Sequence, residues 1–328
     1  MVRPPITSAL RVVFMGSPDF AVPSLRGVAQ AGHSVVLVVT QPDRPAGRGK
    51  HMRRPAVAST ADEMSIPVYQ PRTLRTPEAR APIEALQPDI IIVAAFGLLL
   101  PRPILDLPRY QCINVHASLL PRHRGAAPIQ ACIIQGDRET GISIMQMDPG
   151  MDTGSIVAQQ SLPIGPHDTA RALEERLALL GRDLLLETLP SWLSGDAIAV
   201  PQDENLATYA PRIQRSDAWI DWNRTADECD RRVRAYQGWP NAYTSWNGRT
   251  LLILESRPLD QSIQGTPPGT VLTERGASWS PSVSTGDGQL QLVSVQLEGK
   301  RAMSGAELLN GYPAFATARL GEPKLTDS

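Results

Sequence analysis

The sequence has few lysines, few cysteines, no long apolar run and almost no net charge, and each shortage excludes a class of protein. Its 328 residues carry 32 basic and 33 acidic side chains, so the formal net charge of −1 gives no overall attraction to nucleic acid or to an anionic membrane. Only Lys50, Lys300 and Lys324 are lysines, so most charged contacts would be made by arginine. A polyanionic partner would therefore need a local patch of arginines.

The number and spacing of the three cysteines also argue against certain classes of protein. Cys112, Cys132 and Cys229 are odd in number and contain no CxxC pair, which argues against a disulfide scaffold or a zinc motif and indicates a reducing compartment. No apolar run approaches the roughly 18 residues that a membrane helix requires, and the first residues do not have the pattern of a signal peptide. We therefore expect a soluble, cytoplasmic protein without a metal ion.

The length and the hydrophobic pattern predict two domains. From Arg11 onward, short β-branched runs alternate with helix-like stretches, and continuous runs of this kind are typical of strands buried on both faces. Residues 1–195 are therefore predicted to form an α/β, Rossmann-like domain with a largely parallel sheet. The polar, proline-rich residues 196–212 are predicted to be a linker. Short strand-like pieces with Gly and Asn turns predict a smaller, mainly β domain over residues 213–328, such as a small barrel.

Two turns of the α/β domain bear on ligand binding. The first strand ends in FMGSPDF, which has one glycine, Gly16, where a dinucleotide site would have three, so NAD binding is not expected. The second strand is followed by a loop with five basic residues and one acid, QPDRPAGRGKHMRR. Such a loop suits a phosphate backbone, although a solvated charged surface would explain the same composition.

A polar pair at the end of a later strand is the main candidate for catalysis. In CINVHASLLP, strand alternation places Asn114 and His116 on one face, and Asp152 follows another strand in the turn DPGMDTG. An amide, an imidazole and a carboxylate at the strand ends could stabilise an oxyanion and move a proton without a Ser or Cys nucleophile. The alternatives are a histidine held by a core hydrogen bond, an aspartate that caps a turn, and a metal site, which the spacing does not favour.

Several segments resemble the methionyl-tRNA formyltransferase family, and they follow one another in the family's order from residue 11 to the closing ELLNG. The segments that carry the resemblance are FMGSPDFAVPSL, VVTQPDRPAGRGK, VAAFGLLLP, CINVHASLLPRHRGAAPIQ and ETGISIMQMDPGMDTGSI, followed downstream by IDWNRTADECDRRVRAYQGWPNAYT. The resemblance implies transfer of a formyl group from 10-formyltetrahydrofolate to the α-amino group of methionyl initiator tRNA by a monomeric enzyme. It also implies an OB-like second domain that binds tRNA.

The resemblance further implies a role for individual residues. Asn114 and protonated His116 would bind the developing oxyanion, and Asp152 would orient His116 and relay the proton. The folate donor would bind at Ser118, Leu119, Leu120 and Pro121. The basic loop would contact the tRNA, and the residues implied there are Arg44, Arg48 and Lys50.

Two other functions fit part of the same pattern. A folate-dependent formyltransferase acting on an amino-sugar nucleotide would share Asn114, His116, Asp152 and the SLLP turn, but would not need the basic loop or the second domain. A non-catalytic folate- or tRNA-binding protein would not need all three polar groups. A single-domain glycinamide ribonucleotide transformylase would be shorter, with about 200 residues.

Overall fold

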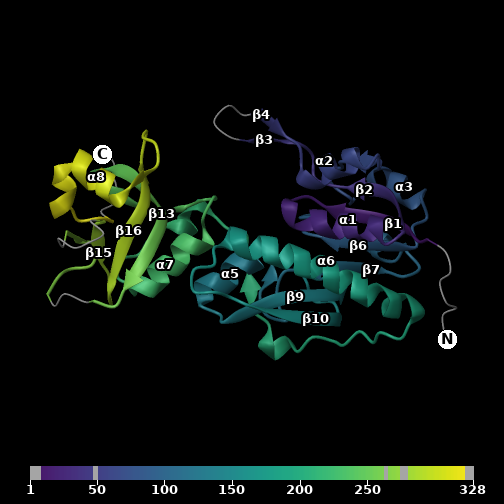
Figure 1. Ribbon diagram of the computed structural model, residues 1–328. Coiled ribbons are helices and arrows are strands. Elements are labelled where there is room, and N and C mark those ends of the chain that lie inside the picture. The colour runs from purple at the N-terminus through teal and green to yellow at the C-terminus, as the bar shows by residue number, and fades with distance from the viewer. Residues whose placement is uncertain (1–8, 47–50, 262–264, 274–279, 322–328) are drawn as a thin grey trace. The chain divides into compact units, whose positions relative to one another are not determined.

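The computed structural model describes residues 9–46, 51–261, 265–273 and 280–321. The chain divides into two compact units (Figure 1). The first comprises Met1–Pro128, Glu139–Pro163 and Leu173–Pro211, and the second comprises Ile129–Arg138, Ile164–Ala172 and Arg212–Ser328. Among the described residues, no helix is both long enough and apolar enough to cross a membrane.

A seven-stranded sheet forms the centre of the first unit. Its order is β10-β9-β7-β6-β1-β2-β5; the pairs from β7 to β5 are parallel, whereas β9 and β10 are antiparallel to their neighbours. All five residues of both β6 and β7 are buried, as continuous apolar runs predict. The strands are β1 (Arg11–Gly16), β2 (Ser34–Val39), β5 (Val68–Tyr69), β6 (Ile90–Ala94), β7 (Cys112–His116), β9 (Glu139–Gln146) and β10 (Ile156–Pro163).

Helices cover both faces of this sheet. On one face, Ile83 of α3 and Ile104 of α4 share a core cluster with Val13 and Ile91 of the central strands. On the other face, α6 lies against β7 at Gly181, where an added Cβ would be 2.8 Å from Val115. The helices are α1 (Val22–Gln30), preceded by a 3-10 turn at Asp19–Ala21, then α2 (Ala56–Glu63), α3 (Pro77–Glu84), α4 (Arg102–Leu105), α5 (Pro128–Gln135), which crosses the boundary between the units, and α6 (Ala170–Ser194), most of which lies in this unit.

The basic segment after β2 differs from the predicted loop. Its described residues form two short antiparallel strands, β3 (Arg44–Ala46) and β4 (His51–Arg53), with Arg44 opposite Arg53. We call these two paired strands, residues 44–46 and 51–53, the hairpin arm, and Figure 1 labels them β3 and β4. Arg48 and Lys50 lie outside the described residues.

The second unit contains an antiparallel sheet, so the predicted combination of an α/β domain with a smaller, mainly β domain is confirmed. The sheet order is β12-β13-β16-β15-β14, and β17 pairs with β16. Helix α7 begins at a capping box between Thr225 and Glu228 and buries Cys229 and Val233 in the core of this unit. The elements are α7 (Ala226–Ala235), β12 (Ala242–Trp246), β13 (Arg249–Leu259), β14 (Val271–Leu272), β15 (Ser282–Ser284), β16 (Gln289–Leu297), β17 (Met303–Ser304) and α8 (Gly305–Gly311), with 3-10 turns at Arg215–Ala218 and Pro313–Thr317.

The segment predicted as a linker is hydrogen-bonded to the first unit. Val200 and Ile156 exchange two backbone hydrogen bonds of 2.8 Å. Farther along, β11 (Tyr209–Ala210) pairs in parallel with β8 (Arg124–Gly125), in the turn that follows β7. We call residues 200–211 the strap. The strap holds the turn after β7, and therefore determines where that turn lies.

Candidate active site

Asn114 and His116 lie on β7 with their side chains on one face of the sheet. Both residues are buried, at 7% and 6% exposure. The register with β6 and β1 places Asn114 on the same face as Val93 and the core cluster that includes α4. Strand alternation alone predicts that the two polar side chains share a face, and the register is consistent with this prediction.

The ring of His116 is held between two oxygen atoms. Its Nε2 lies 3.1 Å from the carbonyl oxygen of His123, and its Nδ1 lies 3.7 Å from Oδ2 of Asp152. A carbonyl can only accept, so Nε2 carries a hydrogen in this bond and Nδ1 faces the carboxylate. A proton gained at Nδ1 would create a positive ring beside the negative charge of Asp152. The structure thus brings His116 and Asp152 together.

Asp152 is held in an unusual backbone conformation in the loop between β9 and β10. Its φ is +56°, in the left-handed region, which few residues other than glycine adopt. Oδ2 accepts a 2.8 Å hydrogen bond from the backbone N–H of Gly125. Earlier in the loop, the carboxylate of Asp148 accepts from the Thr153 hydroxyl at 2.7 Å and from the Gly150 N–H at 3.0 Å. These bonds fix the Asp152 carboxylate toward the imidazole.

The SLLP turn after β7 is built on Ser143 of β9. The Ser143 hydroxyl donates to the carbonyl of Ser118 at 2.6 Å and accepts from the N–H of Leu120 at 3.0 Å. Ser118 and Leu120 are fully buried, whereas Leu119 and Pro121 are half-buried. Direct contact with a ligand would therefore come from Leu119 and Pro121, while the other two residues maintain the shape of the turn.

Arg124 is buried in a charged contact that the sequence does not indicate. Its side chain is 0% exposed, and its guanidinium donates to both carboxylate oxygens of Glu204 in the strap, each at 2.9 Å. The hydrogen bonds from Arg124 lower the pKa of the Glu204 carboxyl below its ordinary value, and Glu204 raises the pKa of Arg124. Arg124 therefore supports the turn and is not available to a polyanion.

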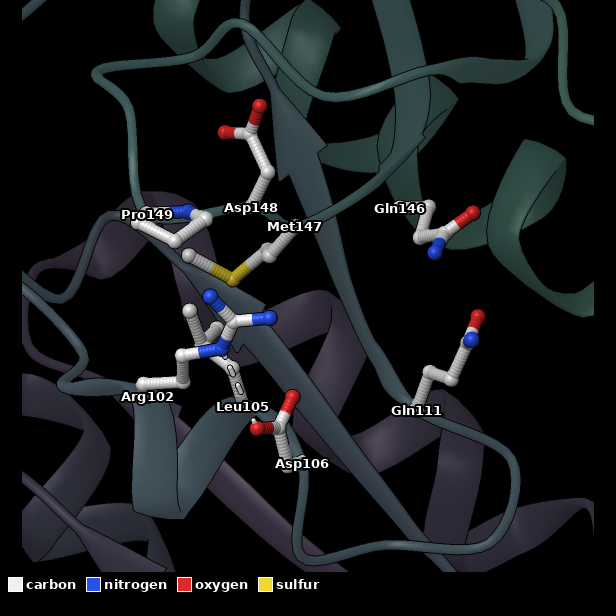
Figure 2. A pocket seen from close by; sticks show the side chains of 8 residues that line it. All are labelled: Arg102, Leu105, Asp106, Gln111, Gln146, Met147, Asp148 and Pro149. Atoms are coloured by element: carbon white, nitrogen blue, oxygen red, sulfur yellow. Dashed lines mark ion pairs between the residues drawn. The ribbon is translucent and has the colours of Figure 1, made fainter.

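A cavity of about 180 Å³ opens at the other end of β7 (Figure 2). It lies between α4, the start of β7 and the beginning of the loop that carries Asp152. In Figure 2, a dashed line marks the ion pair between Arg102 and Asp106, which lie below Met147. None of the residues predicted from the sequence lines it. The lining residues are Arg102, Leu105, Asp106, Gln111, Gln146, Met147, Asp148 and Pro149.

The hairpin arm, β3 and β4, includes one of the three predicted tRNA contacts. Arg44 is exposed on β3. Arg54, just beyond β4, makes hydrogen bonds of 2.8 Å and 2.9 Å to the carboxylate of Asp62. Arg54 is thus engaged within the first unit. Across the described ranges, no group of three or more His, Cys, Asp or Glu residues could hold a metal ion.

Comparison with known proteins shows which proteins the chain resembles. The model for "Formyl transferase" matches residues 10–189, and the model for "Formyl transferase, C-terminal domain" matches residues 212–313. The chain is similar to the methionyl-tRNA formyltransferase of Methylococcus capsulatus, at 44% identity over 95% of this chain and 100% of the relative. It is also similar to that of Hydrogenovibrio crunogenus, at 46% identity over 91% of this chain and 95% of the relative.

Solved structures resemble the chain in fold. An N-formyltransferase from Helicobacter canadensis in complex with folinic acid and dTDP-3-aminofucose has a TM-score of 0.66 at 20% identity, covering 86% of this chain and 98% of that one. A methionyl-tRNA formyltransferase from Clostridium thermocellum has a TM-score of 0.52 at 16% identity, covering 78% of this chain and 95% of that one.

Proposed function

This chain belongs to the methionyl-tRNA formyltransferase family, and we propose that it transfers the formyl group of 10-formyltetrahydrofolate to the α-amino group of methionine carried by initiator tRNA. It is a one-carbon group transferase. The observation that carries the catalytic proposal is the placement of His116 between the His123 carbonyl and the Asp152 carboxylate, next to Asn114 on the same strand.

The geometry supports a division of labour among the three residues. The amine attacks the formyl carbon, a C–N bond forms, and the formyl oxygen gains negative charge that the Asn114 amide stabilises by hydrogen bonding. The amine's proton passes to Nδ1 of His116, because Nε2–H is engaged by the His123 carbonyl. In this proposal His116 acts as a base and not as the protonated oxyanion donor that the resemblance implies. Asp152 stabilises the charged ring. The proton then moves to the folate nitrogen as its bond to the formyl carbon breaks.

The donor is proposed to lie along the face of β7 that bears Asn114 and His116. At one end of this face is the cavity beside Gln111, and at the other is the SLLP turn with the half-buried Leu119 and Pro121. Gln111 and His116 are five residues apart, a span of about 16 Å on a strand. A folate is an elongated molecule, so its ring system could occupy the cavity while its formyl group lies near Asn114.

The acceptor is proposed to bind through the hairpin arm. Arg44 is exposed there, and Arg48 and Lys50 belong to the same segment of the sequence. Guanidinium groups suit phosphate oxygens, so the arm would contact the tRNA backbone and position the aminoacylated end. The arm favours tRNA over an amino-sugar nucleotide as the acceptor, because an amino-sugar nucleotide has no long phosphate backbone for the arm to contact. The enzyme is further proposed to act as a monomer in the cytoplasm.

The direct test is a transfer assay with parallel acceptors. The protein would be incubated with 10-formyltetrahydrofolate and methionyl initiator tRNA, free methionine, or an amino-sugar nucleotide. Formylation of the charged tRNA alone is expected. Formylation of the amino-sugar alone would overturn the proposed acceptor while keeping the catalytic residues, and no transfer to any acceptor would overturn the catalytic proposal.

A further inference from the structure

Gln202 in the strap joins the two loops that hold the Asp152 carboxylate. Its side-chain NH₂ group donates to the backbone carbonyls of Asp152 at 2.8 Å and Gly154 at 2.7 Å. Its side-chain oxygen accepts from Nε and a terminal nitrogen of Arg124 at 3.0 Å and 2.8 Å. The next residue after Arg124 is Gly125, whose N–H donates to the Asp152 carboxylate.

The partners leave only one possible orientation for the Gln202 amide. Backbone carbonyls only accept hydrogen bonds, and a guanidinium only donates them, so the NH₂ group must face the Asp152 loop and the oxygen must face Arg124. All of the amide's donors and its acceptor are then used. No other polar side chain of the same size could satisfy both sides, because a carboxylate has no hydrogens to donate and an ammonium cannot accept.

We propose that Gln202 is a positioning residue for catalysis, which fixes the Asp152 carboxylate against His116 without touching the substrate itself. Asp152 has a strained backbone, with φ of +56°, and the two bonds from Gln202 restrain the carbonyls on either side of Thr153 in that conformation. The side-chain oxygen of Gln202 restrains Arg124. Because Gly125 is the next residue in the chain, this contact also restrains the Gly125 N–H. This inference rests on the proposed function, because it deepens the role of Asp152 in formyl transfer.

The proposed mechanism requires the Asp152 carboxylate to stay close to the His116 ring. Nδ1 of His116 is 3.7 Å from the carboxylate, which is near enough for electrostatic stabilisation but beyond the distance of a hydrogen bond. A shift of the loop by about 1 Å would weaken the stabilisation of the charged imidazole, and misplacement on that scale can cost about 100-fold in rate. Binding of folate and tRNA does not depend on this distance.

The decisive variant is Gln202→Glu, which keeps the acceptor for Arg124 and removes the two donors to the Asp152 loop. We expect kcat to fall by about 10- to 100-fold with little change in KM for either substrate. Gln160→Glu, at an exposed position of β10, introduces the same chemical change and is the matched control, with wild-type kinetics expected. Gln202→Met, which removes the bonds on both sides, should lower kcat at least as much as Gln202→Glu.

A double-mutant cycle separates positioning from general support of the fold. If Gln202 acts through Asp152, then Gln202→Glu should have no further effect on kcat once Asp152 is replaced by Asn. If each substitution lowered kcat by its own factor, and the two factors multiplied in the double variant, the proposal would be overturned. Wild-type kcat in Gln202→Glu or Gln202→Met would also overturn it.

Hydrogen exchange gives a readout that does not depend on formyl transfer. The amide of Gly125 should exchange faster in Gln202→Glu than in the wild type or in Gln160→Glu, because its acceptor, the Asp152 carboxylate, is no longer held in place. If the wild type formylates nothing, the proposed function fails, and this exchange rate alone decides whether Gln202 positions Asp152. Unchanged exchange at Gly125 would overturn the positioning role.

Discussion

Nδ1 of His116 lies 3.7 Å from Oδ2 of Asp152, and that oxygen also accepts the backbone N–H of Gly125 at 2.8 Å. The carboxylate is therefore held by the protein backbone and does not need a bond to the imidazole to keep its place. A charge that is fixed in advance stabilises a positive ring without reorganisation at the moment of proton transfer. The negative charge of Asp152 is therefore expected to matter more for catalysis than its ability to accept a hydrogen bond, and this is what a substitution should test.

Replacement of the three polar residues should lower the transfer rate strongly. Asn114→Ala, His116→Ala and Asp152→Ala are each expected to reduce kcat by about 10²–10⁴-fold, the range for loss of an oxyanion donor or a proton-transfer group. Asp152→Asn should fall in the same range, because it can still accept from Gly125 but carries no charge. Single-turnover formylation of methionyl-tRNA measures the chemical step.

The matched control for Asp152→Asn is Asp196→Asn, an exposed carboxylate that accepts a hydrogen bond from Ser194. It should leave kcat unchanged. Wild-type activity in any variant at position 114, 116 or 152 would remove that residue from the proposed mechanism.

Gly125 should not tolerate a side chain. Its φ is +117°, and an added Cβ would lie 2.6 Å from the carbonyl oxygen of Ala210 in the strap. Gly125→Ala is expected to push β8 away from β11, to weaken the bond to Asp152, and to lower both kcat and stability, the latter by about 1–3 kcal/mol. Steady-state kinetics and urea unfolding of the same preparation would measure the two effects.

Gly32→Ala controls for backbone strain alone. Gly32 has φ of +87°, but an added Cβ there would meet no atom within 4 Å. Its replacement should cost stability without lowering kcat. Equal loss of kcat in the two variants would show that the position of Gly125 beside Asp152 is irrelevant.

Much of the site could be predicted from the sequence because it follows from strand periodicity. Continuous apolar runs indicate the buried parallel strands, and alternation places Asn114 and His116 on one face. Asp152 could be suggested only by its place in a turn that follows another strand, which is a weaker signal, since a left-handed aspartate in a loop produces no periodic pattern. The catalytic role of Asn114, His116 and Asp152 stays a prediction, and so do the folate and tRNA contacts.

The strap could not be predicted, for physical reasons. Strands β8 and β11 have two residues each and pair across more than 80 positions, which leaves no hydrophobic pattern to read. Arg124, in the polar stretch PRHRG, has the sequence pattern of a basic surface, and its burial depends on Glu204 and Gln202 arriving from the strap. A polar, proline-rich sequence therefore predicts a linker in a place where tertiary contacts order the chain.

The buried cysteines should be unreactive in the native protein. All three are buried, and burial raises the pKa of the Cys112 and Cys229 thiols to about 12. The thiolate is the reactive form, so labelling by an aromatic disulfide at about pH 8 should be slow until the protein unfolds, when all three thiols should react. Rapid labelling of any one thiol in native buffer would contradict the burial of that residue.

The Arg124–Glu204 pair should make stability depend on pH in a predictable direction. Because Arg124 lowers the pKa of the Glu204 carboxyl in the folded state, the pair stabilises the fold above the ordinary pKa of about 4.3, and this contribution is lost as the pH falls through the lower, folded pKa. Melting curves of the wild type and Glu204→Gln should therefore differ most near neutral pH and converge in acid. A difference that grows as the pH falls would contradict the sign of the shift.

Replacement of arginines in the basic segment that follows β2 should weaken use of tRNA and leave folate binding intact. Arg48→Ala and Arg44→Ala are each expected to raise KM for methionyl-tRNA and to reduce the slope of log affinity against log salt concentration by about one for each phosphate that the arginine neutralises. Arg26→Ala is the control, because Arg26 is an exposed arginine of α1 that pairs with Glu63. Its salt slope should equal that of the wild type. If Arg48→Ala and Arg44→Ala matched Arg26→Ala in both KM and salt slope, this segment would not bind the tRNA, and the phosphate-binding patch would have to be sought elsewhere among the arginines of the chain.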